Sequence, residues 1–150
     1  MISTVKIRQM VEGDHKSIAA LTNQLGANIS SQMVYNQMGE ILRNPDHFAF
    51  VAMRNHHIVG YIHCFTAIRL TSQPFTEICG LIVDVNERGN GIGKLLVQRV
   101  EGLFDGNRKI RVRCNAKRES AHQFYYHLKY SLSKHQNIFE KEMAQHSGQE

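Results

Sequence analysis

The order of hydrophobic and polar residues changes its period several times along the chain and predicts alternating strands and helices. Residues 4–10 alternate, which indicates a first strand. Apolar residues spaced three or four apart then predict two helices. The first begins at an Asp14 cap and ends at Gly26, and the second begins at Ser30 and ends before Asn44.

Further strands and a long helix are predicted in the middle of the chain. Residues 48–53 and 58–65 are rich in β-forming types and are joined by a short polar link, which indicates a hairpin, and residues 75–83 indicate another strand. After a polar turn, helical spacing begins at Gly91 and continues until Gly106-Asn107.

The last third of the chain continues the alternation of elements. Residues 109–115 predict a strand, residues 118–128 a short helix, and residues 131–143 one or two closing strands, followed by a frayed tail at 143–150. Because the chain has no repeat and no linker, we expect a single α/β (α+β) domain over residues 1–150.

Composition fits this interpretation and excludes several classes of protein. Hydrophobic residues make up 42% of the 150 residues and charged residues 21%, which is typical of a globular protein rather than a disordered one. The longest apolar run, residues 48–53, is far shorter than the roughly 20 residues of a membrane helix. Since the N-terminus also lacks the apolar block of a secretion signal, we expect a cytoplasmic protein.

The net charge of +5, from 18 basic and 13 acidic residues, suggests an anionic partner. That partner could be a phosphate-bearing cofactor, a nucleic acid or an acidic acceptor. The three cysteines, Cys64, Cys79 and Cys114, are widely spaced and are interpreted as reduced core residues. Neither they nor the nine histidines show a metal-ligand pattern, so we expect no metal.

A glycine-rich turn precedes the long helix, with Gly89, Gly91 and Gly93 at alternate positions. Glycines let backbone N–H groups point into one concavity, and the start of the helix adds unpaired donors and partial positive charge. Arg88 and Lys94 stand beside the glycines and add full charges. This pattern favours a phosphate-binding site.

Spacing separates this turn from two common phosphate-binding motifs. A P-loop has four residues between its first glycine and a Gly-Lys-Ser/Thr sequence. Here only three residues lie between Gly89 and Gly93, and Lys94 is followed by Leu95. A dinucleotide fold needs GxGxxG and an acid after the next strand, but this turn is GxGxG and the next strand ends in residues 113–115, Arg-Cys-Asn. Nucleotide triphosphate hydrolysis and a nicotinamide cofactor are therefore disfavoured.

The remaining pattern, R-x-x-G-x-G from Arg88 to Gly93, resembles the acyl-CoA pyrophosphate motif of the GNAT superfamily of N-acetyltransferases. Asn115 and the helical residues 120–125 are similar to the family's second segment, an asparagine followed by Ala-x-x-Phe-Tyr. The glycine usual after that pair is Lys129 here. The resemblance extends over nearly the whole chain and implies a GNAT-like mixed, mostly antiparallel central sheet with helices on both faces.

The resemblance also implies acetyl-CoA as cosubstrate, with its pyrophosphate over the glycine turn. In the family the strand before this turn splays from its neighbour, and its backbone pairs with the pantetheine arm. By this resemblance the cofactor-binding residues are Leu81, Ile82, Val83, Arg88, Gly89, Asn90, Gly91, Ile92, Gly93, Lys94 and Asn115.

Two residues are the catalytic candidates that the resemblance supplies. Tyr125 would be the general acid, because a phenol can protonate the leaving thiolate. Glu77, eleven residues before Arg88, would be the base that takes the proton of the acceptor amine. The alternative role for Glu77 is a salt bridge to the basic strand at 109–115. His63 or His122 could then act as the base in place of Glu77.

These features predict an N-acetyltransferase that moves an acetyl group from acetyl-CoA to a primary amine by direct attack. A non-catalytic acyl-CoA-sensing module and a small basic nucleic-acid-binding protein are the alternatives. We expect a small-molecule or peptide amine as acceptor, with no nucleic acid and no membrane, and leave a homodimer open. Because Lys109, Arg111 and Arg113 share one face of a strand, we expect that face to border the acceptor cleft and to favour acidic amines.

Overall fold

The computed structural model describes residues 4–106 and 108–144 of the chain. These residues form two compact units that meet in the sequence between Asn115 and Ala116. The expected helix end at Asn107 and most of the expected tail at 143–150 lie outside the described residues.

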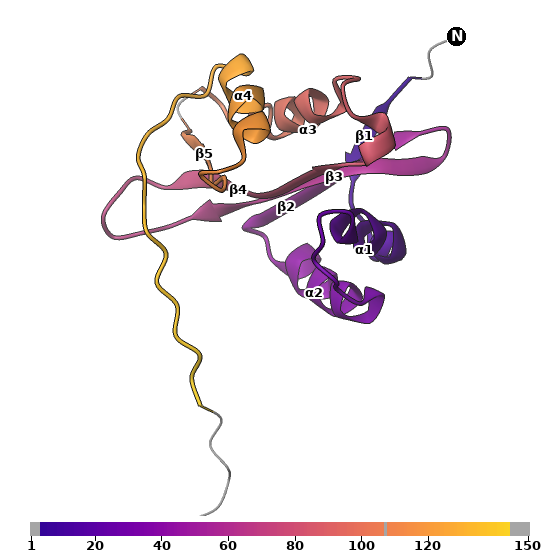
Figure 1. The fold of residues 1–150 in the computed structure, drawn as a ribbon, viewed down its shortest axis with the longest axis horizontal. Helices are drawn as coiled ribbons and strands as arrows, with labels where there is room; N and C mark the ends of the chain where they lie inside the picture. The colour runs from indigo at the N-terminus through magenta and orange to yellow at the C-terminus, as the bar shows by residue number, and fades with distance from the viewer. Residues whose placement is uncertain (1–3, 107, 145–150) are drawn as a thin grey trace, which may run out of the picture. The chain divides into compact units, whose positions relative to one another are not determined.

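The first unit is built on a five-stranded sheet with the order β1-β2-β3-β4-β5 (Figure 1). Three neighbouring pairs are antiparallel and the β4–β5 pair is parallel. The expectation of a mixed, mostly antiparallel sheet is therefore confirmed. The strands are β1 (Lys6–Gln9), β2 (His47–Arg54), β3 (His57–Ala67), β4 (Phe75–Val83) and β5 (Ile110–Val112).

Helices cover both faces of this sheet, as expected. α1 (His15–Asn23) and α2 (Ser31–Arg43) pack on one face, and α3 (Ile92–Glu101) packs on the other (Figure 1). Two short 3-10 helices, Glu12–Asp14 and Val85–Glu87, precede α1 and follow β4. The face covered by α1 and α2 is called the α1/α2 face below.

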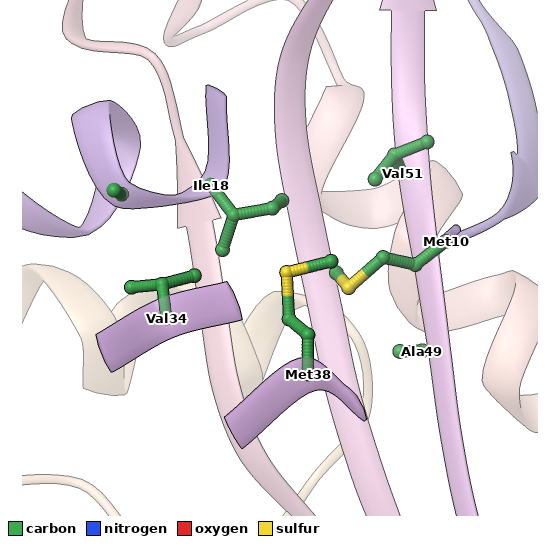
Figure 2. Packing of buried hydrophobic residues seen from close by; sticks show 7 residues of the cluster. Met10, Ile18, Val34, Met38, Ala49 and Val51 are labelled. Atoms are coloured by element: carbon green, nitrogen blue, oxygen red, sulfur yellow. The ribbon is translucent and has the colours of Figure 1, made fainter. Parts of the chain in front are cut away.

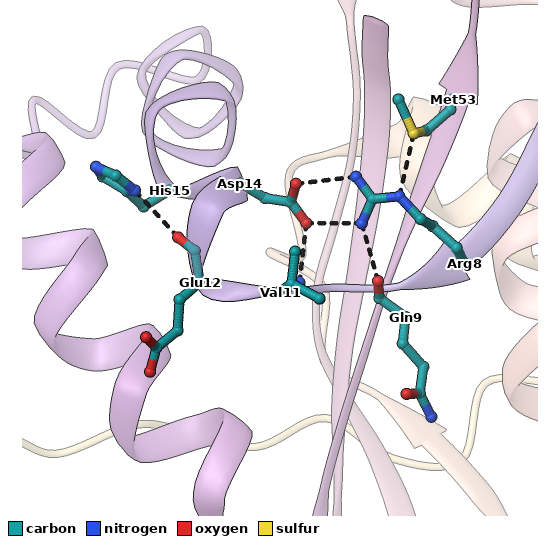
Figure 3. Close-up of polar contacts among 7 residues, drawn as sticks. All are labelled: Arg8, Gln9, Val11, Glu12, Asp14, His15 and Met53. Atoms are coloured by element: carbon teal, nitrogen blue, oxygen red, sulfur yellow. Dashed lines mark hydrogen bonds and ion pairs between the residues drawn. The ribbon is translucent and has the colours of Figure 1, made fainter. Parts of the chain in front are cut away.

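The starts of α1 and α2 are stabilised in different ways. At α2, the Ser30 hydroxyl accepts a hydrogen bond from the backbone N–H of Met33 at 3.1 Å, which is an N-cap as predicted. Asp14 occupies the N-cap position of α1 but does not cap it. Its buried carboxylate instead accepts bonds from the Val11 N–H and from two Arg8 nitrogens, each at 2.9 Å (Figure 3). Although burial alone would raise the pKa of Asp14, these bonds hold it below its usual value.

Apolar side chains fill the space between the sheet and the helices. On the α1/α2 face, Ile18 of α1 and Val34 and Met38 of α2 pack against Ala49 and Val51 of β2 (Figure 2). On the other face, α3 approaches the sheet closely above Gly60, where a Cβ would lie 3.4 Å from side-chain atoms of Ile92 and of Leu96. The buried residues of α3 are Ile92, Leu96, Val97 and Val100.

The β2–β3 hairpin is confirmed and has a two-residue turn. Asn55 and His56 both have positive φ, 51° and 67°, between the paired residues Arg54 and His57. Two successive left-handed residues define the type I′ turn, whose twist matches that of the flanking strands.

Two boundaries predicted from the sequence are wrong. α3 ends at Glu101, because the chain tightens at Gly102, and Phe104 then packs edge-on against the ring of Phe48 at 5.7 Å. Because Phe104 is apolar and lies at the spacing of a further helical turn, the sequence pattern extended the helix too far. β5 covers Ile110–Val112 instead of residues 109–115, and it is an edge strand among the strands that the structure describes.

The second unit contains α4 (Glu119–His127), close to its predicted range. The helix ends with Tyr130 N–H bonded to the Tyr125 carbonyl and with Lys129 at φ 72°, which is a Schellman motif. Lys129 thus takes the left-handed position that glycine usually occupies. The strands expected at 131–143 are absent from the described residues, since the apolar residues there, such as Ile138 and Phe139, remain exposed and have no neighbouring strand.

Candidate active site

The turn between β4 and α3 has the backbone conformation that its glycines predict. Gly89 and Gly91 have φ of 83° and 81°, in the left-handed region, and a Cβ at either position would meet no heavy atom within 4 Å. Gly91 is the N-cap of α3, and Gly93 lies in the first turn of that helix. The turn therefore presents an open, side-chain-free backbone surface.

The start of α3 supplies hydrogen-bond donors at this surface. Leu95 N–H bonds to the Gly91 carbonyl at 3.1 Å, so the preceding N–H groups of Ile92, Gly93 and Lys94 have no acceptor within the helix. The helix dipole adds partial positive charge at the same place. The Ile92 side chain is buried, and it can contribute to anion binding through its backbone alone.

Exposed cations stand on both sides of the turn. The Arg88 and Lys94 side chains reach solvent, as does Asn90 between them. Arg88 Nε also donates to the Val83 carbonyl oxygen at 3.3 Å, which ties the turn to the end of β4. The residues predicted to bind a pyrophosphate are thus brought together, with donors and positive charge around an open surface.

The second half of β4 has one open edge. β5 pairs with β4 from Thr76 to Ile78, whereas β4 continues to Val83 and pairs there with β3 alone among the described strands. A β-bulge separates the two halves, since Ile78 and Gly80 have partners on β3 and Cys79 has none. The structure thus has the splayed strand that the family resemblance implied.

Backbone groups along this open edge alternate in direction. Asp84 N–H bonds to the Val59 carbonyl of β3, so Ile82, two residues earlier, is also directed toward β3. The N–H and C=O groups of Leu81 and Val83 are directed to the open edge instead. Of the three strand residues predicted to bind the pantetheine arm, Leu81 and Val83 therefore offer backbone groups.

Glu77 lies in the first half of β4 and forms an ion pair. Its carboxylate accepts a hydrogen bond from Arg113 Nε at 3.0 Å, so the alternative of a salt bridge to the basic strand is confirmed. Arg111 lies over the ring of Phe75 at 4.2 Å. Two of the three cations on the basic face of residues 109–115 thus have partners within the unit.

A pair of histidines lies on the same face of the sheet as Glu77. His47 Nδ1 and His63 Nε2 are 2.8 Å apart, and the His47 ring also stacks on Phe65. Phe65 faces Glu77 across the β3–β4 register. Burial, together with the nearby His47, lowers the pKa of His63 to about 4, so its ring is neutral near pH 7. Sequence patterning did not reveal this pair, because the two residues are sixteen positions apart.

The two remaining predicted residues belong to different units, Asn115 to the first and Tyr125 to the second. Asn115 follows β5 and is exposed. Tyr125 belongs to α4, is 9% exposed, and packs edge-on against the rings of Phe124 and Tyr130 at 4.9 and 5.6 Å. The alternative base His122 lies in the same helix.

The expectation of three core cysteines is confirmed for Cys64, which is buried, but is wrong for Cys79, which is exposed; Cys114 is half-buried. Burial raises the pKa of the Cys64 thiol to about 12, and partial desolvation together with the nearby Glu77 raises the pKa of the Cys79 thiol to about 11, so neither thiol is activated. Within residues 4–106 and 108–144, His, Cys, Asp and Glu side chains form no group of three that could hold a metal ion. No helix in the described part of the chain has the length and apolar character needed to cross a membrane.

Comparisons with known proteins agree with this geometry. The profile of the acetyltransferase (GNAT) family matches residues 17–130. No curated protein sequence matches the chain at a significant level. Many solved structures share the fold, three of which are an aminoglycoside acetyltransferase bound to CoA, a second aminoglycoside acetyltransferase and a transcriptional regulator.

The first of these structures is the aminoglycoside N-acetyltransferase AAC(6')-Iy in complex with CoA, with a TM-score of 0.84 and 19% identity over 95% of this chain and 98% of that one. AAC(6')-Ih from Acinetobacter baumannii has a TM-score of 0.80 and 16% identity over 94% and 100%. A transcriptional regulator from Bacillus halodurans C-125 has a TM-score of 0.75 and 20% identity over 92% and 100%.

The family match covers well over half of the chain, and the chain belongs to the GNAT family of acetyltransferases.

Proposed function

We propose that this protein is an N-acetyltransferase that uses acetyl-CoA to acetylate a primary amine of a small molecule or peptide. The observation that carries the proposal is the combination, within one unit, of the glycine turn before α3 and the open edge of β4 directly before it. One element suits a pyrophosphate and the other suits an extended amide-containing arm.

The residues of the first unit fit acetyl-CoA. The turn from Arg88 to Lys94 would hold the pyrophosphate through the N–H groups at the start of α3 and through its two cations. Leu81 and Val83 would pair with the pantetheine amides through their outward backbone groups. A structural neighbour with 19% identity was solved in complex with CoA, which supports this assignment.

When bound, acetyl-CoA supplies an acetyl group already activated as a thioester. Backbone N–H groups at the bulge and open edge of β4 would hold the carbonyl oxygen and stabilise negative charge there. By the family resemblance, Tyr125 would donate its phenolic proton to the leaving sulfur. Glu77, or a histidine or water in its place, takes the proton from the acceptor amine so that its lone pair can attack.

Direct transfer is favoured over a route through an acetylated cysteine. With the pKa of Cys79 at about 11, the thiol next to the bulge is protonated near pH 7 and is a weak nucleophile. The amine and the thioester must then be bound at the same time before the acetyl group is transferred.

Release of CoA over a panel of primary amines, together with acetyl-CoA binding measured by calorimetry, tests the proposal. An N-acetyltransferase releases CoA in stoichiometric amounts with at least one amine. Acetyl-CoA binding without CoA release for every amine indicates the acyl-CoA-sensing alternative. If acetyl-CoA does not bind, the glycine turn is not a site for its pyrophosphate.

A further inference from the structure

A cavity of about 160 Å³, partly open to solvent, lies within the first unit, between α1, α2 and the sheet. Apolar side chains make up most of its wall, and Figure 2 shows five of them, Met10, Ile18, Val34, Met38 and Ala49. A cavity of this size and character is large enough for a benzene ring.

Four polar side chains line the cavity: Gln37 lies on α2, whereas Thr22 of α1 and Tyr61 and His63 of β3 form a polar side. The Tyr61 hydroxyl is 2.7 Å from the Thr22 hydroxyl, and His63 lies two residues along the strand. Tyr61 and His63 face Ile82 and Gly80 across the β3–β4 register. A Cβ on Gly80 would lie 3.9 Å from Cε1 of Tyr61. The polar side of the cavity therefore borders the half of β4 that has an open edge.

The lining contains no side chain with a permanent charge. None of the residues that form the wall is Asp, Glu, Lys or Arg. His63 is its one titratable group near neutral pH, and its lowered pKa keeps it uncharged there. A cationic group pushed into this space would lose its hydration without gaining a counter-ion, which costs several kcal/mol.

From this geometry we infer the chemical class of the acceptor: a primary monoamine that carries one compact apolar arm, either an aromatic ring or a branched alkyl group. The arm occupies the cavity, and the amine, which is charged until the base takes its proton, lies outside the apolar space beside the half-buried Gly80, where it keeps its hydration. This inference rests on the proposed function and adds the acceptor to it. It contrasts with the polycationic aminoglycosides in the names of two structural neighbours, for which this lining offers no carboxylate.

Burial of the arm should appear directly in the rates. Removing a phenyl-sized apolar surface from water favours 2-phenylethylamine over methylamine by roughly 30-fold or more in kcat/KM. The polycation kanamycin should be acetylated more slowly than either.

Two substitutions alter the cavity in opposite directions. Ala49→Leu fills it from β2, and Val34→Ala enlarges it from α2. Ala20→Leu, on the exposed side of α1, is the matched control. The experiment measures binding of 2-phenylethylamine to the full chain by calorimetry, and CoA release with 2-phenylethylamine, the larger 2-(1-naphthyl)ethylamine, methylamine and kanamycin.

The expected result is that 2-phenylethylamine binds the wild type and Ala20→Leu equally, Ala49→Leu at least about 10-fold more weakly, and that Val34→Ala shifts the preference to larger arms. Equal binding by the wild type and Ala49→Leu, no binding, or faster turnover of kanamycin overturns the inference. Because binding is measured without acetyl-CoA, this result is separate from that for the proposed function, which fails if no amine causes CoA release. Should Ala49→Leu not fold, Val34→Ala alone decides, since an unchanged arm preference contradicts the inference.

Discussion

Arg113 donates a hydrogen bond to Glu77 at 3.0 Å, and this ion pair joins β5 to β4 beside the last residue pair of the two strands, Ile78 and Val112. The strands separate directly after it. Glu77 therefore lies where β4 leaves its neighbour, next to the bulge at Cys79. A carboxylate there can fasten the two strands, accept a proton, or do both.

Glu77→Gln and Arg113→Gln separate these roles. If Glu77 takes the proton of the amine, Glu77→Gln lowers kcat/KM by about 10²-fold or more near pH 7, and the loss shrinks at high pH, where the amine is already neutral. Arg113→Gln leaves the base in place and should cost less than about 10-fold. Since the Arg113 side chain is 45% exposed, Arg113→Gln should lose little stability, whereas Glu77→Gln weakens the hydrogen bonding of a side chain that is only 12% exposed and should lose more. Equal and small losses, with unchanged pH profiles, would assign Glu77 to strand pairing alone.

Gly91→Val tests the glycine turn. A β-branched side chain at φ 81° is strained by about 2 kcal/mol and projects over the surface where a phosphate would lie. Gly26→Val is a matched control, because Gly26 has φ 84° and equally open surroundings. Both variants should lose similar stability in urea unfolding, whereas Gly91→Val alone should weaken acetyl-CoA binding, by 10-fold or more, in calorimetry. Equal affinity in the two variants contradicts a role for this turn.

Much of this arrangement could be predicted from the sequence, because local rules decide it. The turn at residues 88–94 needs glycine for its backbone, and the α2 cap needs the Ser30 hydroxyl, so both appear in the residue types themselves. The bulge had a weak local signal in Gly80, a glycine inside a strand pattern. The His47–His63 pair had none, since its contact depends on the register of β2 on β3.

Two of the wrong predictions have a common physical cause. Apolar spacing alone assigns Phe104 to a helix and residues 131–143 to strands. Spacing records that a side chain is apolar, not what will cover it. Phe104 is covered by Phe48 after the helix has ended, and Ile138 is not covered within the described chain.

The histidine pair predicts a specific pH dependence of stability. The pKa of His63 is about 4 in the folded protein and near 6.5 when unfolded, so the unfolded state binds a proton first as the pH falls. The stability that the neutral ring contributes is present above about pH 6.5 and is lost between about pH 6.5 and 4. His63→Gln should flatten the slope of unfolding free energy against pH in this range. His57→Gln, in the exposed hairpin, should keep the wild-type slope, and identical slopes for the two variants would contradict this account.

Lys129→Gly should stabilise the end of α4. Lys129 has φ 72° at the position after the helix where glycine pays no steric penalty, so the substitution relieves strain worth up to about 1 kcal/mol. Lys129→Ala removes the charge and keeps the strain, which makes it the control. Urea unfolding of the three proteins measures the effect. Equal changes in the free energy of unfolding for Lys129→Gly and Lys129→Ala would show that the left-handed conformation of Lys129 is not strained.

Tyr125→Phe tests the proposed general acid with the least disturbance to α4. Tyr125 is nearly buried between the Phe124 and Tyr130 rings, and phenylalanine preserves both ring contacts while removing the proton that the leaving sulfur needs. We expect kcat to fall by roughly 10²-fold or more, with little change in acetyl-CoA affinity. Tyr126→Phe is the control, because Tyr126 is the next residue on the same helix, is 46% exposed, and loses the same hydroxyl. The comparison must use an amine for which chemistry limits turnover, shown by a burst-free time course. Near-wild-type turnover in Tyr125→Phe would transfer the role of acid to another group or to water, and equal losses in the two variants would indicate an effect of the helix surface rather than proton transfer.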